Sequence, residues 1–106
     1  MTVSKISDIN IYDDFDLTSP VESKTIKPNK KYYIRLNDIK RYENKYKIYG
    51  ISYHDNVCFK YLTKGVFSFI YTEKKDKLLN KITIIVVLYS EHDHICKEFK
   101  LIIKED

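Results

Sequence analysis

The stretch "ITIIVVLY" at residues 82–89 decides the fold class of this 106-residue chain. It is the longest predominantly apolar run in the sequence, and most of its residues are β-branched. A helix that spans a bilayer needs about 20 apolar residues, whereas a run of this length and composition predicts a β-strand. Successive residues of a strand point to opposite faces, and here both sets are apolar. We therefore expect both faces of this strand to be covered, as in the centre of a sheet.

The segments on either side of this run alternate between apolar and polar residues with the period of a strand. In "KYYIRL" (31–36), for example, Tyr32, Ile34 and Leu36 share one face. Further strands are expected at 45–53, 57–62, 65–72 and 95–104. No long amphipathic helix is predicted, because only "TEKKDKLLNK" (72–81) could form a helical turn or two.

These elements predict a single all-β domain over residues 1–106, and two architectures fit their order. The first prediction is a small OB-like Greek-key barrel, which has five strands and a helix between the third and the fourth. The alternative is an immunoglobulin-like β-sandwich, which requires 9–12 and 21–26 as additional strands. A helix at 72–81 would favour the barrel, and a plain loop would favour the sandwich.

Charge divides the chain into three zones. Residues 1–23 carry one lysine and five acids, a net charge of −4. Residues 24–64 carry eleven lysines and arginines against three acids, a net of +8, and residues 65–106 balance seven against seven. The acidic N-terminal segment is expected to form one or two edge strands or a mobile arm.

Lysines and tyrosines interleave in the basic zone, and this combination is typical of proteins that bind single-stranded nucleic acid. Cations follow the phosphates, while aromatic rings stack on unpaired bases. With 17 lysines and 2 arginines in the chain, binding to single-stranded DNA or RNA would be electrostatic and weakly sequence-specific. The residues predicted to share one sheet face are Lys31, Tyr33, Arg35, Lys45, Lys47, Tyr49, Tyr53 and Lys60.

The alternative function is a small protein-binding or inhibitory β module that uses exposed aromatic residues. Tyrosine is enriched at the energetic centres of protein interfaces. On this interpretation Tyr33, Tyr49 and Tyr53, with Phe67 and Tyr71, would face the partner, and a homo-oligomer is left open. The excess of residues with AT-rich codons fits a viral, mobile-element or bacterial origin. The same lysines and tyrosines also fit an ordinary solvated strand face.

Two similar pentads, "HDNVC" (54–58) and "HDHIC" (92–96), offer metal ligands. His54, Cys58, His94 and Cys96 would give tetrahedral zinc coordination if the two turns lay side by side. A disulfide between the cysteines is a second alternative. We expect two polar surface turns with free thiols instead, because the spacing matches no established zinc motif, and therefore no cofactor.

Catalysis has little support in the sequence. Two glycines are too few for a phosphate-binding loop, and neither a nucleophile elbow nor a metalloprotease motif occurs. The N-terminus lacks the apolar stretch of a signal peptide, and no segment is long enough for a membrane-spanning helix. We therefore expect a non-enzymatic, intracellular protein of the cytoplasm with no membrane association.

Overall fold

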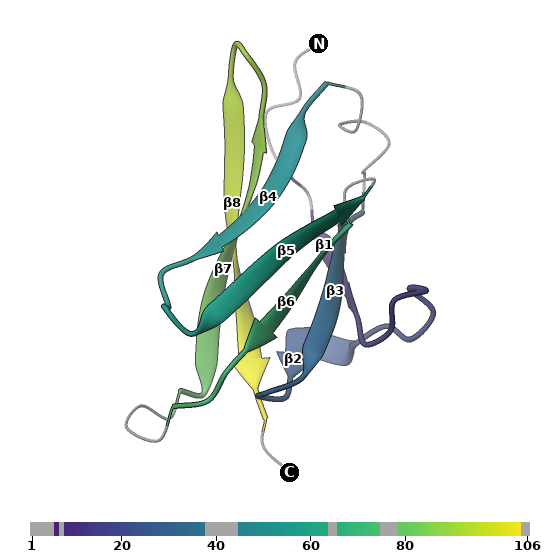
Figure 1. The fold of residues 1–106 in the computed structure, drawn as a ribbon, viewed down its shortest axis with the longest axis vertical. Coiled ribbons are helices and arrows are strands. Elements are labelled where there is room, and N and C mark those ends of the chain that lie inside the picture. The colour runs from purple at the N-terminus through teal and green to yellow at the C-terminus, as the bar shows by residue number, and fades with distance from the viewer. Residues whose placement is uncertain (1–5, 7, 38–44, 64–65, 75–78, 105–106) are drawn as a thin grey trace.

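The computed structural model describes residues 6, 8–37, 45–63, 66–74 and 79–104 and contains eight β-strands (Figure 1). They form two sheets of four strands each. The first sheet has the order β1 (Ile9–Tyr12), β3 (Lys31–Leu36), β6 (Val66–Tyr71), β5 (Val57–Thr63). The second sheet has the order β2 (Thr25–Ile26), β8 (His94–Ile103), β7 (Lys81–Tyr89), β4 (Lys47–Ser52). A single 3-10 turn, η1 (Glu22–Lys24), precedes β2.

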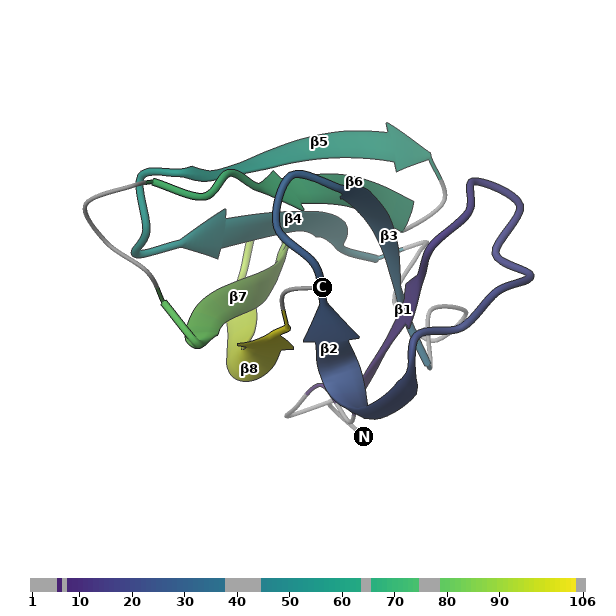
Figure 2. The same ribbon diagram turned by 90° about the horizontal axis from the view of Figure 1, so that it is seen from below.

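The all-β prediction is confirmed, and the strand order matches the alternative architecture. All strand pairs are antiparallel except the short parallel pair of β2 with β8. The orders β1-β3-β6-β5 and β8-β7-β4 correspond to the ABED and CFG sheets of an immunoglobulin-like sandwich. In Figure 2 the first sheet can be followed from β5 through β6 and β3 to β1. Closure into the five-stranded barrel, the first of the two predictions, is not seen.

The prediction of a five-stranded barrel did not count the N-terminal segment as a strand, whereas in the structure this segment forms β1 of the first sheet. Ile9 and Ile11 of β1 are each 3% exposed, and β1 pairs with β3 from Ile9↔Leu36 to Tyr12↔Tyr33. The acidic segment therefore supplies an edge strand that belongs to the core. In the region expected to decide between the folds, the described residues 72–74 and 79–80 contain no helix, and residues 75–78 lie outside the described part of the chain.

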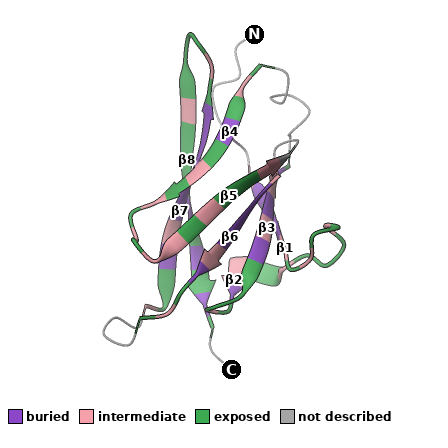
Figure 3. Cartoon of the chain, in the orientation of Figure 1, coloured by how far each residue is buried: buried purple, intermediate pink, exposed green. Residues whose placement is uncertain are grey.

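The core lies between the inner faces of the two sheets (Figure 3). A fully buried aliphatic or aromatic side chain contributes about 1.5–3 kcal/mol relative to an exposed one. The most deeply buried strand residues include Ile34, Phe67, Phe69, Ile84, Val86, Leu88 and Leu101, each at most 1% exposed.

Among the described residues, no helix has the length and apolarity needed to cross a membrane.

Gly50 lies in β4 with its missing side chain directed into the core. A Cβ atom at this position would lie 2.8 Å from Cε2 of Phe67 and 2.9 Å from Cδ1 of Phe59. The pairing of β4 with β7 runs through Gly50 without a change of register. The glycine therefore makes room for two aromatic rings of the opposite sheet and does not mark a bulge.

Candidate functional site

The residues predicted to form one nucleic-acid-binding face lie on two different faces. Lys31, Tyr33 and Arg35 belong to β3 and Lys60 to β5, so all four lie in the first sheet. Lys47 and Tyr49 belong to β4 of the second sheet, Tyr53 directly follows β4, and Lys45 precedes it. The two sheets pack through their inner faces, so their outer faces point in opposite directions. The prediction that these residues share one sheet face is therefore wrong, because β3 and β4 belong to different sheets.

The outer face of the second sheet, here called the β7 face, is formed by the outward side chains of β4, β7 and β8. Strand pairing places Tyr49, Val87 and Cys96 in one row across the sheet. The next row contains Ile51, Ile85 and Glu98. The remaining outward residues are Lys47, Tyr89 and His94 at one end and Thr83, Lys100, Lys81 and Ile102 at the other.

Most of the exposed large apolar side chains that the structure describes lie on the β7 face. Seven large apolar side chains are exposed in the described part of the chain, and five of them lie on this face. Between them, Ile85 and Val87 are only 8% and 6% exposed although they point outward. Exposed apolar residues gathered on one sheet face make that face a candidate for a binding surface. The five exposed residues are Tyr49, Ile51, Tyr53, Tyr89 and Ile102.

Two contacts fix the tyrosines of this face. Tyr49 and Tyr89 pack edge to face, with ring centroids 5.3 Å apart. The hydroxyl of Tyr53 donates a hydrogen bond of 2.8 Å to the Glu98 carboxylate and so crosses over β7, which lies between β4 and β8. This hydrogen bond and the negative charge of Glu98 raise the pKa of Tyr53, because both favour the protonated phenol. The tyrosine side chains thus lie in defined positions on the sheet.

Sequence reasoning missed five apolar residues of this face. The absence of alternation in residues 82–89 is a signal that could have indicated the three of them that lie in β7. That run predicts a central strand covered on both faces. β7 does lie between β8 and β4, and its outward residues Ile85 and Val87 are only 8% and 6% exposed. Phe67 and Tyr71, predicted to face a partner, are each 1% exposed and belong to the core. The missed residues are Ile51, Ile85, Val87, Tyr89 and Ile102.

The outer face of the first sheet, here called the β3 face, is smaller and more basic. Tyr12 and Tyr33 are cross-strand neighbours on it, and Phe15 packs edge-on against Tyr33 at 5.7 Å. The Nε atom of Arg35 is buried and makes no hydrogen bond within the structure. The only charged residues at outward positions in the described strands of this face are Lys31, Arg35 and Lys60.

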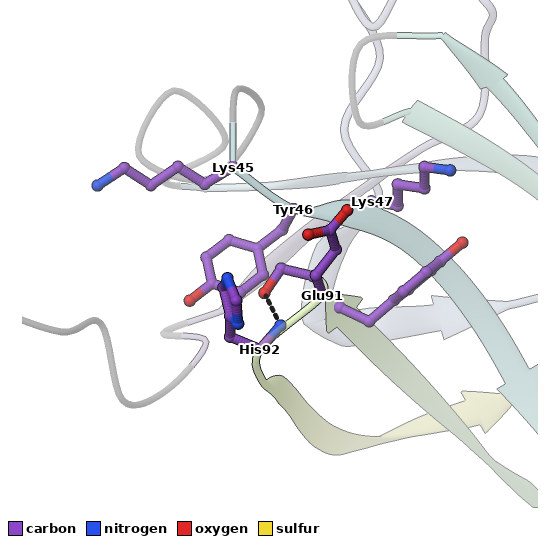
Figure 4. A pocket seen from close by; sticks show the side chains of 7 residues that line it. Lys45, Tyr46, Lys47, Glu91 and His92 are labelled. Carbon is purple, nitrogen blue, oxygen red and sulfur yellow. Dashed lines mark hydrogen bonds between the residues drawn. The ribbon is translucent and has the colours of Figure 1, made fainter.

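A pocket of about 620 Å³ lies at the β7–β8 hairpin beside the β7 face (Figure 4). Figure 4 shows that Lys45 and Lys47 point away from each other and that Glu91 lies between them. The hairpin itself is held by Ser90, whose Oγ accepts a hydrogen bond from the amide of His92 at 3.3 Å. Because the two lysines point apart and a carboxylate lies between them, the pocket lacks the cluster of cations that would favour phosphate binding.

The structure does not bring the four candidate zinc ligands together. Lys47 pairs with Tyr89 beside the β7–β8 hairpin, so the β4–β5 connection that carries His54 lies at the other end of β4 (Figure 1). Nε2 of His54 accepts a hydrogen bond from the amide of Thr83 at 3.3 Å. Among the described residues no group of three or more potential ligands is close enough to hold a metal ion.

The cysteines are separated in the same way. Cys58 pairs with Ile70 on the β3 face, whereas Cys96 pairs with Val87 on the β7 face, where His94 also lies. Both are exposed free thiols. The disulfide considered from the sequence is therefore not formed, and the two pentads are unrelated surface features.

Comparison with known proteins adds no family to this description. No protein-family model matches the chain, and no curated protein matches it either. Any functional assignment must therefore follow from the two outer faces, of which the β7 face is the more apolar.

Proposed function

We propose that the protein is a protein-binding module and that the β7 face is its binding surface. The observation that carries this proposal is the gathering of five of the seven exposed large apolar side chains on one sheet face around the outward Ile85 and Val87. Burial of such a surface against a partner is favourable by about 25 cal/mol for each Å² removed from water. Tyrosines at its centre are typical of interface residues that contribute most of the binding energy.

The chemistry of the β7 face fits a protein better than a nucleic acid. Ile51, Ile85 and Val87 are aliphatic and cannot stack on bases as aromatic rings do. Glu98 adds a carboxylate at the middle of the sheet, in the same row as Ile85, where it would repel phosphates. A protein surface can cover the aliphatic residues and leave Glu98 hydrogen-bonded to Tyr53.

Panning of a phage-displayed library of randomised peptides against the immobilised protein tests this proposal. The double variant Tyr49→Ser/Ile51→Ser removes two exposed apolar side chains from the β7 face. We expect it to weaken binding of the enriched peptides at least tenfold, because truncation of interface anchors typically costs about 2 kcal/mol or more. The measurement is the dissociation constant by biolayer interferometry.

The matched control is Phe15→Ser/Tyr61→Ser, which removes the two exposed large apolar side chains that lie outside the β7 face. We expect this control to bind the same peptides as the parent protein does. Peptides that depend on Phe15 or Tyr61 and not on Tyr49 or Ile51 would contradict the proposal. Circular dichroism of each variant confirms that loss of binding is not loss of folding.

A second candidate function is binding of single-stranded nucleic acid at the β3 face. The observation that favours it is that four of the eight predicted residues, Lys31, Tyr33, Arg35 and Lys60, share this face. No acid occupies an outward position in its described strands, although Asp13 in the adjoining loop pairs with Lys30 at 3.3 Å. Lysines and tyrosines on one face supply charge and stacking together.

A salt series with a fluorescent single-stranded oligonucleotide tests this candidate. We expect Lys31→Ala/Lys60→Ala to flatten the slope of log K against log salt by about 0.7 for each phosphate that the variant no longer neutralises. The control Lys47→Ala/Lys100→Ala removes the same charge from the opposite face and should leave the slope unchanged. Absence of binding at low salt, or equal effects of the two pairs, would rule out the β3 face as the site.

A further inference from the structure

We infer that the partner of the β7 face is a protein whose contact surface is apolar at the centre and carries carboxylates at the rim. This inference rests on the proposed function and adds the charge of the partner. It derives from the three lysines at outward positions of the β7 face, Lys47, Lys81 and Lys100, all of which are exposed.

The lysines lie toward the two ends of the β7 face, and the row of Thr83 and Lys100 separates Ile102 from the other apolar residues. Lys47 lies at the hairpin end of the face, opposite Tyr89. Lys81 and Lys100 lie at the other end, beside Ile102 and Thr83. The apolar rows of Tyr49–Val87 and Ile51–Ile85 lie between these ends. The β7 face therefore has an apolar centre and a polar rim, which is the usual layout of a protein interface. Lysines lie at both ends of this rim, and Glu91 of the hairpin pocket lies near Lys47 at one of them.

Lys47, Lys81 and Lys100 form no ion pair with a described residue. Glu98 is the only carboxylate at an outward position in the described strands of this face, and it already accepts the hydrogen bond of Tyr53. The face thus presents three lysines that have no ion-pair partner in the described part of the chain, and carboxylates on the partner would complement them.

A second copy of the chain fits this face less well. Two β7 faces brought together would place six lysines at outward strand positions around one interface, and the only carboxylates at such positions in the described strands would be those of the two Glu98 residues. Like charges across an interface disfavour association. The same charge balance favours a partner that brings carboxylates of its own.

Two displayed peptide libraries test the inference. Both contain the same randomised apolar core, and they differ in the flanking positions, which are Asp and Glu in one and Lys and Arg in the other. We expect binders that depend on Tyr49 and Ile51 to come from the acid-flanked library. Lys47→Glu/Lys100→Glu should weaken these binders at least tenfold at low salt and by a smaller factor at 0.5 M salt, because rim charges are screened.

The control Lys27→Glu/Lys30→Glu makes the same change of net charge in the connection between β2 and β3, and we expect it to alter binding less than twofold. Face-dependent binders that prefer basic flanks, or show no preference, would overturn the inference and leave the proposed function intact. Peptides that bind independently of Tyr49 and Ile51 would overturn the proposed function itself. A dimer in sedimentation that Tyr49→Ser/Ile51→Ser dissociates, or displacement of the peptides by single-stranded DNA, would also overturn the inference.

Discussion

Replacement of Gly50 by alanine is expected to lower the free energy of unfolding by about 1–3 kcal/mol, the usual cost of overpacking a core. The added Cβ would come within 3.0 Å of both Phe67 and Phe59. Neither ring can move away easily, because Phe67 is 1% exposed and Phe59 also packs against Phe69 with centroids 6.1 Å apart. Where no such clash exists, the same substitution stabilises a protein by about 0.4–1 kcal/mol, so the sign of the change is diagnostic.

A double-mutant cycle with Phe67→Leu separates the clash from other effects of alanine. Leucine lacks the Cε2 atom that the new Cβ would meet. In the Phe67→Leu background we therefore expect Gly50→Ala to cost at least 0.5 kcal/mol less than in the parent, a coupling typical of residues in contact, at about 0.5–3 kcal/mol. Urea unfolding of the four proteins measures each free energy. Equal costs in both backgrounds would mean that the two residues do not share this space.

Local alternation predicted the strands well but could not predict their partners. The expected strands 31–36, 57–62 and 95–104 agree with β3, β5 and β8 to within about one residue at each end. Strand pairing is a non-local property, however, and β1 joins β3 through contacts about 25 residues apart in sequence. The period of two determines which residues share a side of one strand, and says nothing about which sheet receives it.

The same limit explains the outcome for the candidate site. Alternation correctly placed Lys47 and Tyr49 on the polar side of one strand and Tyr33 and Arg35 on that of another. In a barrel these sides would form one surface, whereas in a sandwich they belong to opposite outer faces. The same holds for Cys58 and Cys96. Both are exposed, as expected for free surface thiols, but they lie in different sheets.

We expect threonine substitutions on the inner and the outer face of β7 to lower the free energy of unfolding by different amounts. Ile84 is 0% exposed and points into the core, whereas its neighbour Ile85 is 8% exposed and points outward. We expect Ile84→Thr to cost about 2–4 kcal/mol, because it buries a hydroxyl without a partner and removes apolar packing from the core. Ile85→Thr should cost about 1 kcal/mol or less, because Ile85 lies outside the core cluster between the sheets and threonine suits strands.

The comparison tests the premise of the proposed function, since the two substitutions are chemically identical and differ only in the face they change. Urea unfolding of both variants gives the difference directly. Equal and large costs would mean that a further layer of the chain covers the β7 face, and no surface would remain for a partner. A small cost at Ile85 together with weaker peptide binding would mean that the apolar residues at 85 and 87 serve association and not folding. The continuous apolar run of residues 82–89 then has two separate causes: its inward residues stabilise the sandwich, and its outward residues form the centre of the interface.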